Sequence, residues 1–151
     1  MTAAHATDAG EPISLCADFS FIPDDTQFPQ DFDLGVFHFH SNSPRHWFAN
    51  ATLGEVGLQF FDQGAEIGVL TSVPEVKMRI GTFNGETHIT ALNSAGATVA
   101  NLTVPGTNSY QDLTVQGTDI VKLSLKGGGH EGILVRACVE VAINGSTSIP
   151  K

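Results

Sequence analysis

Residues 76–93 read VKMRIGTFNGETHITALN, and this stretch decides the fold. Apolar residues and cations alternate along residues 76–80, and residues 87–93 repeat a two-residue alternation of polar and apolar side chains. Because successive side chains of a pleated strand point to opposite faces, each run predicts a strand with one buried face. The Asn84-Gly85 pair between the runs is a typical turn sequence. The stretch therefore predicts antiparallel β-structure.

Similar runs follow one another from about Ser14 onward, separated by Gly, Pro, Asn or Asp. No twelve-residue window shows the apolar stripe of a helix. The predicted strands are residues 15–21, 35–40, 57–61, 67–70, 76–82, 87–93, 98–104, 110–115, 120–126 and 133–142. About ten evenly spaced strands predict an all-β fold, a two-sheet antiparallel β-sandwich or jelly roll. We expect one domain over residues 14–143, between flexible segments at 1–13 and 144–151.

The composition is that of a globular protein, with 41% hydrophobic and 15% charged residues. The net charge of −9 repels phosphate backbones, so we expect no nucleic-acid partner. No apolar run approaches the roughly 20 residues of a membrane-spanning helix, so we expect no membrane insertion. Low charge and abundant Thr, Asn and Gly favour an extracellular or cell-surface location. Since residues 1–12 lack a secretory signal, either that signal has been removed or the chain stays inside the cell.

Two cysteines stand near the two ends of the strand-rich region. Cys16 and Cys138 each lie in a β-like run. If those strands are neighbours, a disulfide closes a loop of more than a hundred residues and stabilises the fold by about 4 to 5 kcal/mol in the chain-entropy model. The alternative is a pair of small buried thiols. We predict the disulfide.

Most of the basic residues face outward from only three predicted strands. If those strands share a sheet, one face of an acidic molecule carries a positive patch. In the alternative, carboxylates such as Glu75 and Glu140 neutralise the cations across neighbouring strands. The five basic residues concerned are Lys77, Arg79, Lys122, Lys126 and Arg136.

Three of the six histidines lie close together in residues 35–48, GVFHFHSNSPRHWF. On a strand, His38 and His40 project from one face, opposite the two phenylalanines that alternate with them. Two imidazoles so placed can share a metal ion, and His46 can add a third nitrogen, a ligand set that suits zinc or copper. The alternative is a strand whose polar histidines simply face water.

The same segment also has the residue types of a sugar-binding loop. Trp47 offers an aromatic face for stacking on sugar C–H groups, and His40, Arg45 and His46 offer donors for hydroxyl groups. Tyr110 is a second aromatic residue at the edge of a loop. These five residues are our candidate ligand-binding residues. The alternative is that the single Trp of a β-sandwich fills the core between its sheets.

Residues 73–141 resemble the C-terminal half of galactose-binding-like and carbohydrate-binding jelly-roll modules. The resemblance lies in the runs PEVKMRIGTF, THITALNSAGATVANLTV and DIVKLSLKGGGHEGILVRACVEV. It implies a module that binds glycans and is often attached to an enzyme or surface protein. Such modules commonly hold a structural calcium, but this chain has Arg136 and Cys138 where many place acidic residues. Asp18 and Glu140 remain possible calcium ligands if the first and last strands meet.

The His-x-His pair also resembles the metal motif of cupins, but residues 41–48 lack the Glu that follows it in that family. The chain has no Gly-x-Ser-x-Gly, P-loop or Cys-x-x-Cys motif. We therefore predict a non-catalytic carbohydrate-binding module. The first alternative is an adhesive, self-assembling subunit, a homo-oligomer that pairs through its N-terminal segment or a strand edge. The second is a small cupin-like metal-dependent enzyme centred on His38 and His40.

Overall fold

A computed structural model describes residues 12–142. These residues form eleven antiparallel strands that are joined by turns and short loops. Within them, no helix is long and apolar enough to cross a membrane. The strands are β1 (Pro12–Asp18), β2 (Gln27–Phe28), β3 (Asp31–Leu34), β4 (Phe37–Ser41), β5 (Trp47–Thr52), β6 (Glu55–Phe60), β7 (Ala65–Thr82), β8 (Thr87–Asn93), β9 (Thr98–Val104), β10 (Ser109–Gly127) and β11 (Gly132–Ala142).

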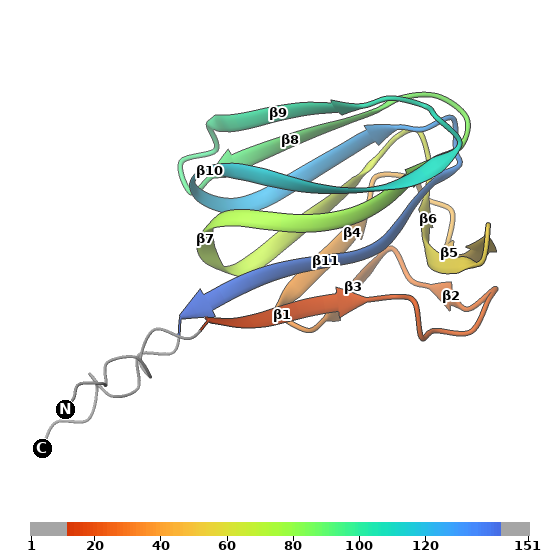
Figure 1. Cartoon of the computed structure of the whole chain (residues 1–151), viewed down its shortest axis with the longest axis horizontal. Helices are drawn as coiled ribbons and strands as arrows, with labels where there is room; N and C mark the ends of the chain where they lie inside the picture. Colours follow the sequence, from red (N-terminus) through yellow and green to blue (C-terminus); the bar gives the residue numbers. More distant parts are fainter. Residues whose placement is uncertain (1–11, 143–151) are drawn as a thin grey trace, which may run out of the picture.

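Two long strands, β7 and β10, run through both layers of a sandwich (Figure 1). One layer, which we call sheet I, has the strand order β3-β4-β7-β10-β8-β9. It contains the first part of β7 and the second part of β10. The other layer, which we call sheet II, has the strand order β2-β5-β6-β11-β7-β10. It contains the second part of β7 and the first part of β10. β1 extends sheet II by pairing with β11.

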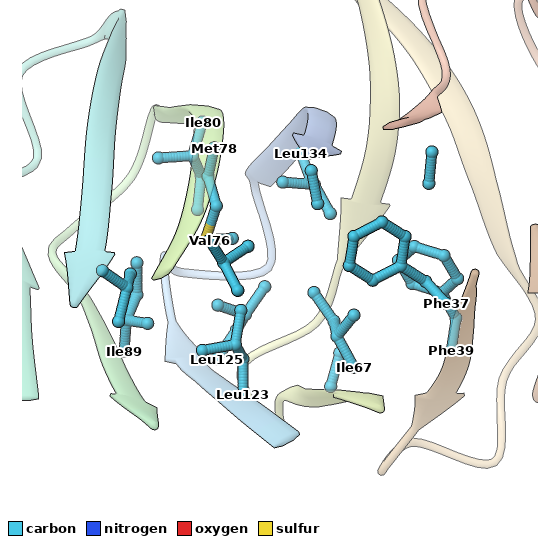
Figure 2. Close-up of a cluster of buried hydrophobic side chains, with 14 of the residues drawn as sticks. Phe37, Phe39, Ile67, Val76, Met78, Ile80, Ile89, Leu123, Leu125 and Leu134 are labelled. Atoms are coloured by element: carbon cyan, nitrogen blue, oxygen red, sulfur yellow. The ribbon is translucent and has the colours of Figure 1, made fainter. Parts of the chain in front are cut away.

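The core lies between the two sheets (Figure 2). Ile67, Ile89 and Leu123 of sheet I face Val76 and Ile80 of sheet II, and all five are at most 1% exposed. Burying each such side chain contributes roughly 1.5 to 3 kcal/mol. The period-two alternation that predicted these strands is therefore the pattern that fills the core.

An aromatic cluster closes the core beside β2 and β3. The rings of Phe28 and Phe32 stack at 4.6 Å, and Phe32 stacks on Phe39 at 5.0 Å. Phe19 meets Phe39 edge to face at 5.4 Å. Trp47 lies against Phe32 and is fully buried, and its indole N–H donates to the Pro29 carbonyl at 2.6 Å. These Phe and Trp side chains thus fill the end of the core that lies beside the short strands β2 and β3.

The predicted two-sheet β-sandwich is confirmed, with differences in detail. Four predicted strands fuse into β7 and β10, which bend from one sheet to the other. β2, β3 and β5 are additional strands in segments outside the predicted strands. The Asn84-Gly85 turn connects β7 to β8, but these strands do not pair, since β8 pairs with β9 and β10. Pro12 and Ile13 begin β1, while residues 1–11 and 143–151 lie outside the described residues.

The predicted disulfide is confirmed. Cys16 and Cys138 lie directly opposite each other in the register of β1 and β11 and form a disulfide across 122 positions of sequence. The condition for a positive patch is not met, because the cations do not share one outer face: Lys77, Arg79 and Arg136 lie on sheet II, and Lys122 and Lys126 lie on sheet I. Three of the five cations are paired with acids, namely Lys77, Arg79 and Lys122. Lys77 contacts Glu140 at 3.4 Å and Glu75 at 3.9 Å, as the alternative proposed.

Candidate ligand-binding site

The outer face of sheet II contains a hollow of about 490 Å³. Its walls come from β5, β6, β11 and the loops next to them. Asn50, Gln59 and Ile133 point into it because their chain neighbours Ala49, Leu58 and Leu134 point into the core. The lining residues are Asn50, Thr52, Leu53, Gln59, Phe83, Asn108, Glu131 and Ile133. We call this feature the hollow.

The turn between β5 and β6 forms one wall of the hollow. Thr52 pairs with Glu55, so the connection has only two residues, Leu53 and Gly54, with φ values of 51° and 82°. Two left-handed residues define the tight hairpin turn that matches strand twist, and Asn or Gly usually occupies the first position. Leu53 stands there instead and is 69% exposed. The turn thus presents an apolar side chain to solvent at the rim.

Two side chains beneath this turn hold it in place. The Arg79 guanidinium donates through Nε and Nη2 to the two carboxylate oxygens of Glu55, at 2.8 and 2.6 Å, and through Nη1 to Asp112 at 3.0 Å. These hydrogen bonds lower the pKa of Glu55 and raise that of Arg79. The Tyr110 hydroxyl donates to the Thr52 carbonyl at 2.9 Å, and burial raises the pKa of Tyr110 to about 12. The turn is therefore fixed from both of its ends.

An aromatic pair forms a second part of the wall. Phe83 and Tyr110 meet edge to face at 5.3 Å. Both rings lie over Gly81, where an added Cβ would be only 2.5 Å from Phe83 and 2.8 Å from Tyr110. Gly81 thus allows the rings to lie close to the sheet. The half-buried Phe83 ring contacts Tyr110 on one side and lines the hollow on the other.

Amide and carboxylate groups complete the lining. The Asn50 side-chain N–H donates to the Gln59 side-chain carbonyl, and Gln59 Nε2 donates to the His130 carbonyl at 2.8 Å. This chain of hydrogen bonds leaves the side-chain oxygen of Asn50 as an acceptor. Asn108 and Glu131 are exposed, and within residues 12–142 their side chains make no hydrogen bond or ion pair. The hollow therefore combines apolar surface with polar groups that are available to a ligand.

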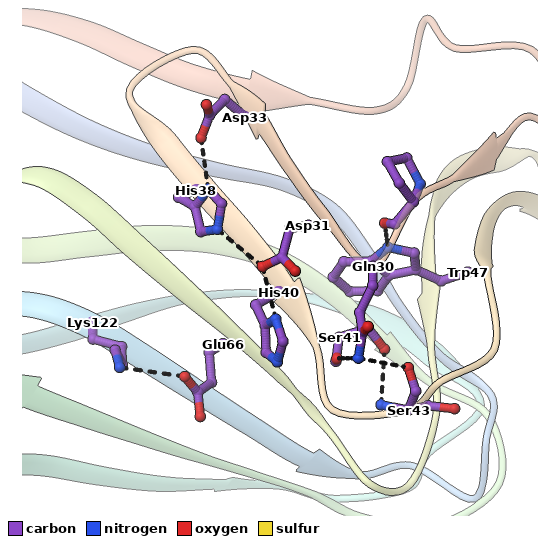
Figure 3. Close-up of polar contacts among 11 residues, drawn as sticks. Gln30, Asp31, Asp33, His38, His40, Ser41, Ser43, Trp47, Glu66 and Lys122 are labelled. Atoms are coloured by element: carbon purple, nitrogen blue, oxygen red, sulfur yellow. Dashed lines mark hydrogen bonds and ion pairs between the residues drawn. The ribbon is translucent and has the colours of Figure 1, made fainter.

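The predicted histidine site lies on the opposite side of the molecule, on the outer face of sheet I (Figure 3). His38 and His40 project from one face of β4, and the alternating phenylalanines are buried. Asp31 Oδ1 contacts His40 Nδ1 at 2.8 Å and His38 Nε2 at 3.2 Å. Asp33 Oδ1 contacts His38 Nδ1 at 2.7 Å. Hydrogen bonds to the two carboxylates raise the pKa of His38, and the bond from His40 lowers that of Asp31.

The five predicted ligand-binding residues are not brought together. Trp47, the expected stacking residue, is fully buried in the aromatic cluster, as the alternative proposed, so its ring is not available to a sugar. The Arg45 guanidinium lies 4.0 Å from the Phe61 ring centre, and His46 is exposed in the loop. Tyr110 alone lies beside the hollow, on the other sheet from His40. The loop 41–48 therefore does not gather the predicted sugar-binding residues into one site.

The predicted metal ligands also need correction. His38 and His40 share their strand face with Asp31 and Asp33 of β3, and not with His46. In residues 12–142, no group of three or more His, Cys, Asp or Glu side chains could hold a metal ion. Both histidines face solvent, whereas a cupin holds its metal inside the barrel. Of the two possible calcium ligands, Asp18 lies opposite Arg136 and accepts from Ser20, and Glu140 contacts a lysine.

Comparison with known proteins finds similarity at the level of the fold. No protein-family model and no curated protein matches the chain. An arabinose-bound α-L-arabinofuranosidase matches 84% of this chain with a TM-score of 0.49 and 12% identity, and this chain covers 26% of that protein. A mutant family 29 carbohydrate-binding module matches 93% of the chain with a TM-score of 0.46 and 11% identity, over 98% of that module.

A third structure is the C-terminal family 6 carbohydrate-binding module of a marine laminarinase from Zobellia galactanivorans. It matches 85% of this chain with a TM-score of 0.42 and 10% identity, over 98% of that module. These three structures are similar to this chain in fold. The chain spans about a quarter of the length of the arabinofuranosidase.

The sequence alone did not indicate the residues that line the hollow. They come from positions 50 to 133 and from several elements, and only the sheet order brings them together. One local signal was present, because Leu53-Gly54 separates two alternating runs by two residues, the spacing of a tight hairpin. A large apolar residue at the first position of such a turn is exposed and strained, which is typical of a functional position.

Proposed function

We propose that this protein is a non-catalytic carbohydrate-binding module and that the glycan occupies the hollow. The observation that supports this proposal is the composition of its lining. Phe83 and Leu53 offer apolar surface to the C–H groups of a sugar ring. The side chains of Asn50, Asn108 and Glu131 offer hydrogen-bond acceptors, and Asn108 also offers donors, to its hydroxyl groups.

The arrangement favours binding over catalysis. Glycoside hydrolysis requires two carboxyl groups across the scissile bond, about 5 to 9.5 Å apart. Glu131 is the one carboxylate among the lining residues of the hollow. Both the Thr52–Glu55 turn and the Phe83 ring are held by contacts within the protein, so little ordering is needed when a ligand binds.

A glycan array followed by titration calorimetry tests the proposal. Replacing Phe83 with Ala removes the ring, and we expect the affinity for the selected oligosaccharide to fall roughly tenfold to a hundredfold, from the loss of about 1.5 to 3 kcal/mol of apolar contact. Phe21→Ala is the matched control, because Phe21 is 88% exposed and is not among the lining residues. If both variants bind the oligosaccharide as tightly as the wild type, the hollow is not the binding site.

The proposal includes an extracellular or cell-surface setting, which the disulfide supports, because disulfides persist mainly in oxidising compartments. Thiol trapping of Cys16 and Cys138 in protein isolated from its native cells tests this part. We expect both cysteines to be oxidised, and free thiols would contradict the setting. The predicted self-association through the N-terminal segment concerns residues 1–11, which lie outside the described residues.

A further inference from the structure

The hollow contains one charged side chain, and that side chain has no partner. Glu131 is exposed, and within residues 12–142 its carboxylate makes no hydrogen bond or ion pair. None of the other lining residues is Lys, Arg or His. The carboxylate therefore sets the sign of the electrostatic potential in the hollow, and the net charge of −9 adds to it.

Two groups close to the hollow that can carry positive charge already face acids of the protein. Arg79, beneath the β5–β6 turn, donates to Glu55 at 2.8 and 2.6 Å and to Asp112 at 3.0 Å. The His130 ring faces Asp62, with Nδ1 accepting from the Asp62 backbone N–H at 3.0 Å and Nε2 lying 3.9 Å from its carboxylate. Neither group is therefore available to balance the unpaired carboxylate of the hollow.

A tight loop between β10 and β11 carries Glu131. Residues 127–130 have φ values of 97°, 85°, 60° and 66°, so four successive residues lie in the left-handed region. At Gly129 an added Cβ would collide with the carbonyl oxygen of Asn84, so only glycine allows this close approach. The Asn84 side-chain N–H also donates to the Gly129 carbonyl at 3.0 Å. The loop is thus packed against the turn between β7 and β8.

His130 fixes the end of this loop next to Glu131. Its backbone N–H donates to Asp62 Oδ1 at 3.2 Å, and its carbonyl accepts from Gln59 Nε2 at 2.8 Å. The Glu131 N–H donates to the Gly128 carbonyl at 2.9 Å. Because these bonds hold the backbone on both sides of the carboxylate, little ordering of the loop is needed when a ligand contacts it.

We propose that the hollow prefers glycans that carry a protonated amino group, and that Glu131 selects them. This inference rests on the proposed glycan binding and names the class of sugar. The ammonium group of an amino sugar donates a charge-assisted hydrogen bond to the carboxylate. The C–H groups of the same ring pack on Phe83, and Asn50 and Asn108 bind its hydroxyl groups.

The expected preference is moderate, because the carboxylate is exposed. A carboxylate also accepts hydrogen bonds from hydroxyl groups, so neutral sugars bind at the same place. The added attraction of an ammonium group at an exposed site strengthens binding roughly threefold to fivefold. A uronic acid binds more weakly than a neutral sugar, since its own carboxylate lies near Glu131 and meets no cation among the lining residues.

NMR titration of the isotope-labelled full chain with two series of monosaccharides tests the proposal. One series is glucosamine, glucose and glucuronic acid, and the other is galactosamine, galactose and galacturonic acid. At about pH 6, where an aliphatic amine keeps its proton, we expect each amino sugar to bind roughly threefold to fivefold more tightly than its neutral parent. The shifts should appear at Phe83 and Glu131, and the uronic acids should bind most weakly. Salt at about 0.5 M should remove this order, because it screens exposed charges.

Two variants separate the charge of Glu131 from the charge of the whole protein. Glu131→Gln keeps the size of the side chain, and we expect it to lower the affinity for the amino sugar to that for the neutral sugar. Glu140→Gln is the matched control, because it removes the same charge from the outer face of the same sheet. The Glu140 side chain is 42% exposed and does not line the hollow, so this variant should keep the preference.

The outcomes distinguish this inference from the proposed function. If a neutral sugar binds in the hollow as tightly as its amino counterpart, the preference for amines is overturned and the glycan site remains. The same conclusion follows if Glu131→Gln, shown to be folded by circular dichroism, keeps the preference of the wild type. If no sugar of either series shifts the residues of the hollow, both the inference and the placement of the glycan in the hollow fail.

Discussion

Replacing Arg79 with Lys tests how the wall of the hollow is held. Arg79 is 23% exposed and makes two hydrogen bonds to Glu55 and one to Asp112, of which a single ammonium group can keep only part. A hydrogen bond to a charged group contributes about 1.5 to 3 kcal/mol when buried and less when exposed. Because this site is partly exposed, we expect the free energy of unfolding to fall by about 1 to 2 kcal/mol.

Urea unfolding measures this loss. With a slope of about 2 kcal/mol per molar urea, the midpoint should fall by roughly 0.5 to 1 M. Hydrogen exchange at the amides of Leu53 and Gly54 should rise, because the turn loses the contact that fixes Glu55. Lys77→Ala is the control, since the exposed pair of Lys77 with Glu140 contributes at most about 1 kcal/mol. An Arg79→Lys midpoint and turn exchange equal to the wild type would refute this reasoning.

Three further predictions concern the disulfide, the buried Trp47 and the pH dependence of His38. Replacing Cys16 and Cys138 with Ser should lower the free energy of unfolding by up to about 5 kcal/mol, measured by urea unfolding, because the disulfide spans 122 positions; a loss below about 1 kcal/mol would contradict this. Trp47→Ala should cost about 3 to 5 kcal/mol because the indole is fully buried, yet glycan affinity of the folded variant should not change. The pKa of His38 is raised in the folded protein, so its stabilising effect is complete below the unfolded pKa and is lost as pH rises through the folded pKa; His38→Asn should therefore lower the melting temperature at pH 6 but not at pH 9.

The sequence predicted the sandwich because alternation is a local signal. Residues 76–80 alternate apolar and charged side chains, and the apolar ones fill the core. β3 was missed because its sequence Asp-Phe-Asp-Leu looks like part of an acidic loop, although Phe32 and Leu34 pack inward and the two aspartates face the histidines. The hollow was missed because its residues meet only through the strand order, which periodicity alone does not determine.

The prediction for Trp47 failed for a related reason. Sequence alone does not distinguish an aromatic residue after a turn from one that begins a strand. β5 starts at Trp47 itself, and the alternation Trp47, Ala49 places both side chains in the core. By contrast, the pairing of Cys16 with Cys138 was predictable because each lies in a strong β run near one end of the domain.

Chemical-shift mapping by NMR tests the central claim most directly. The isotope-labelled chain is titrated with the best oligosaccharide from the glycan array. We predict that the largest shifts occur at Leu53, Phe83 and Asn108, around the hollow. Shifts confined to the loop 41–48, or to the outer face of sheet I, would place the sugar elsewhere and contradict the account.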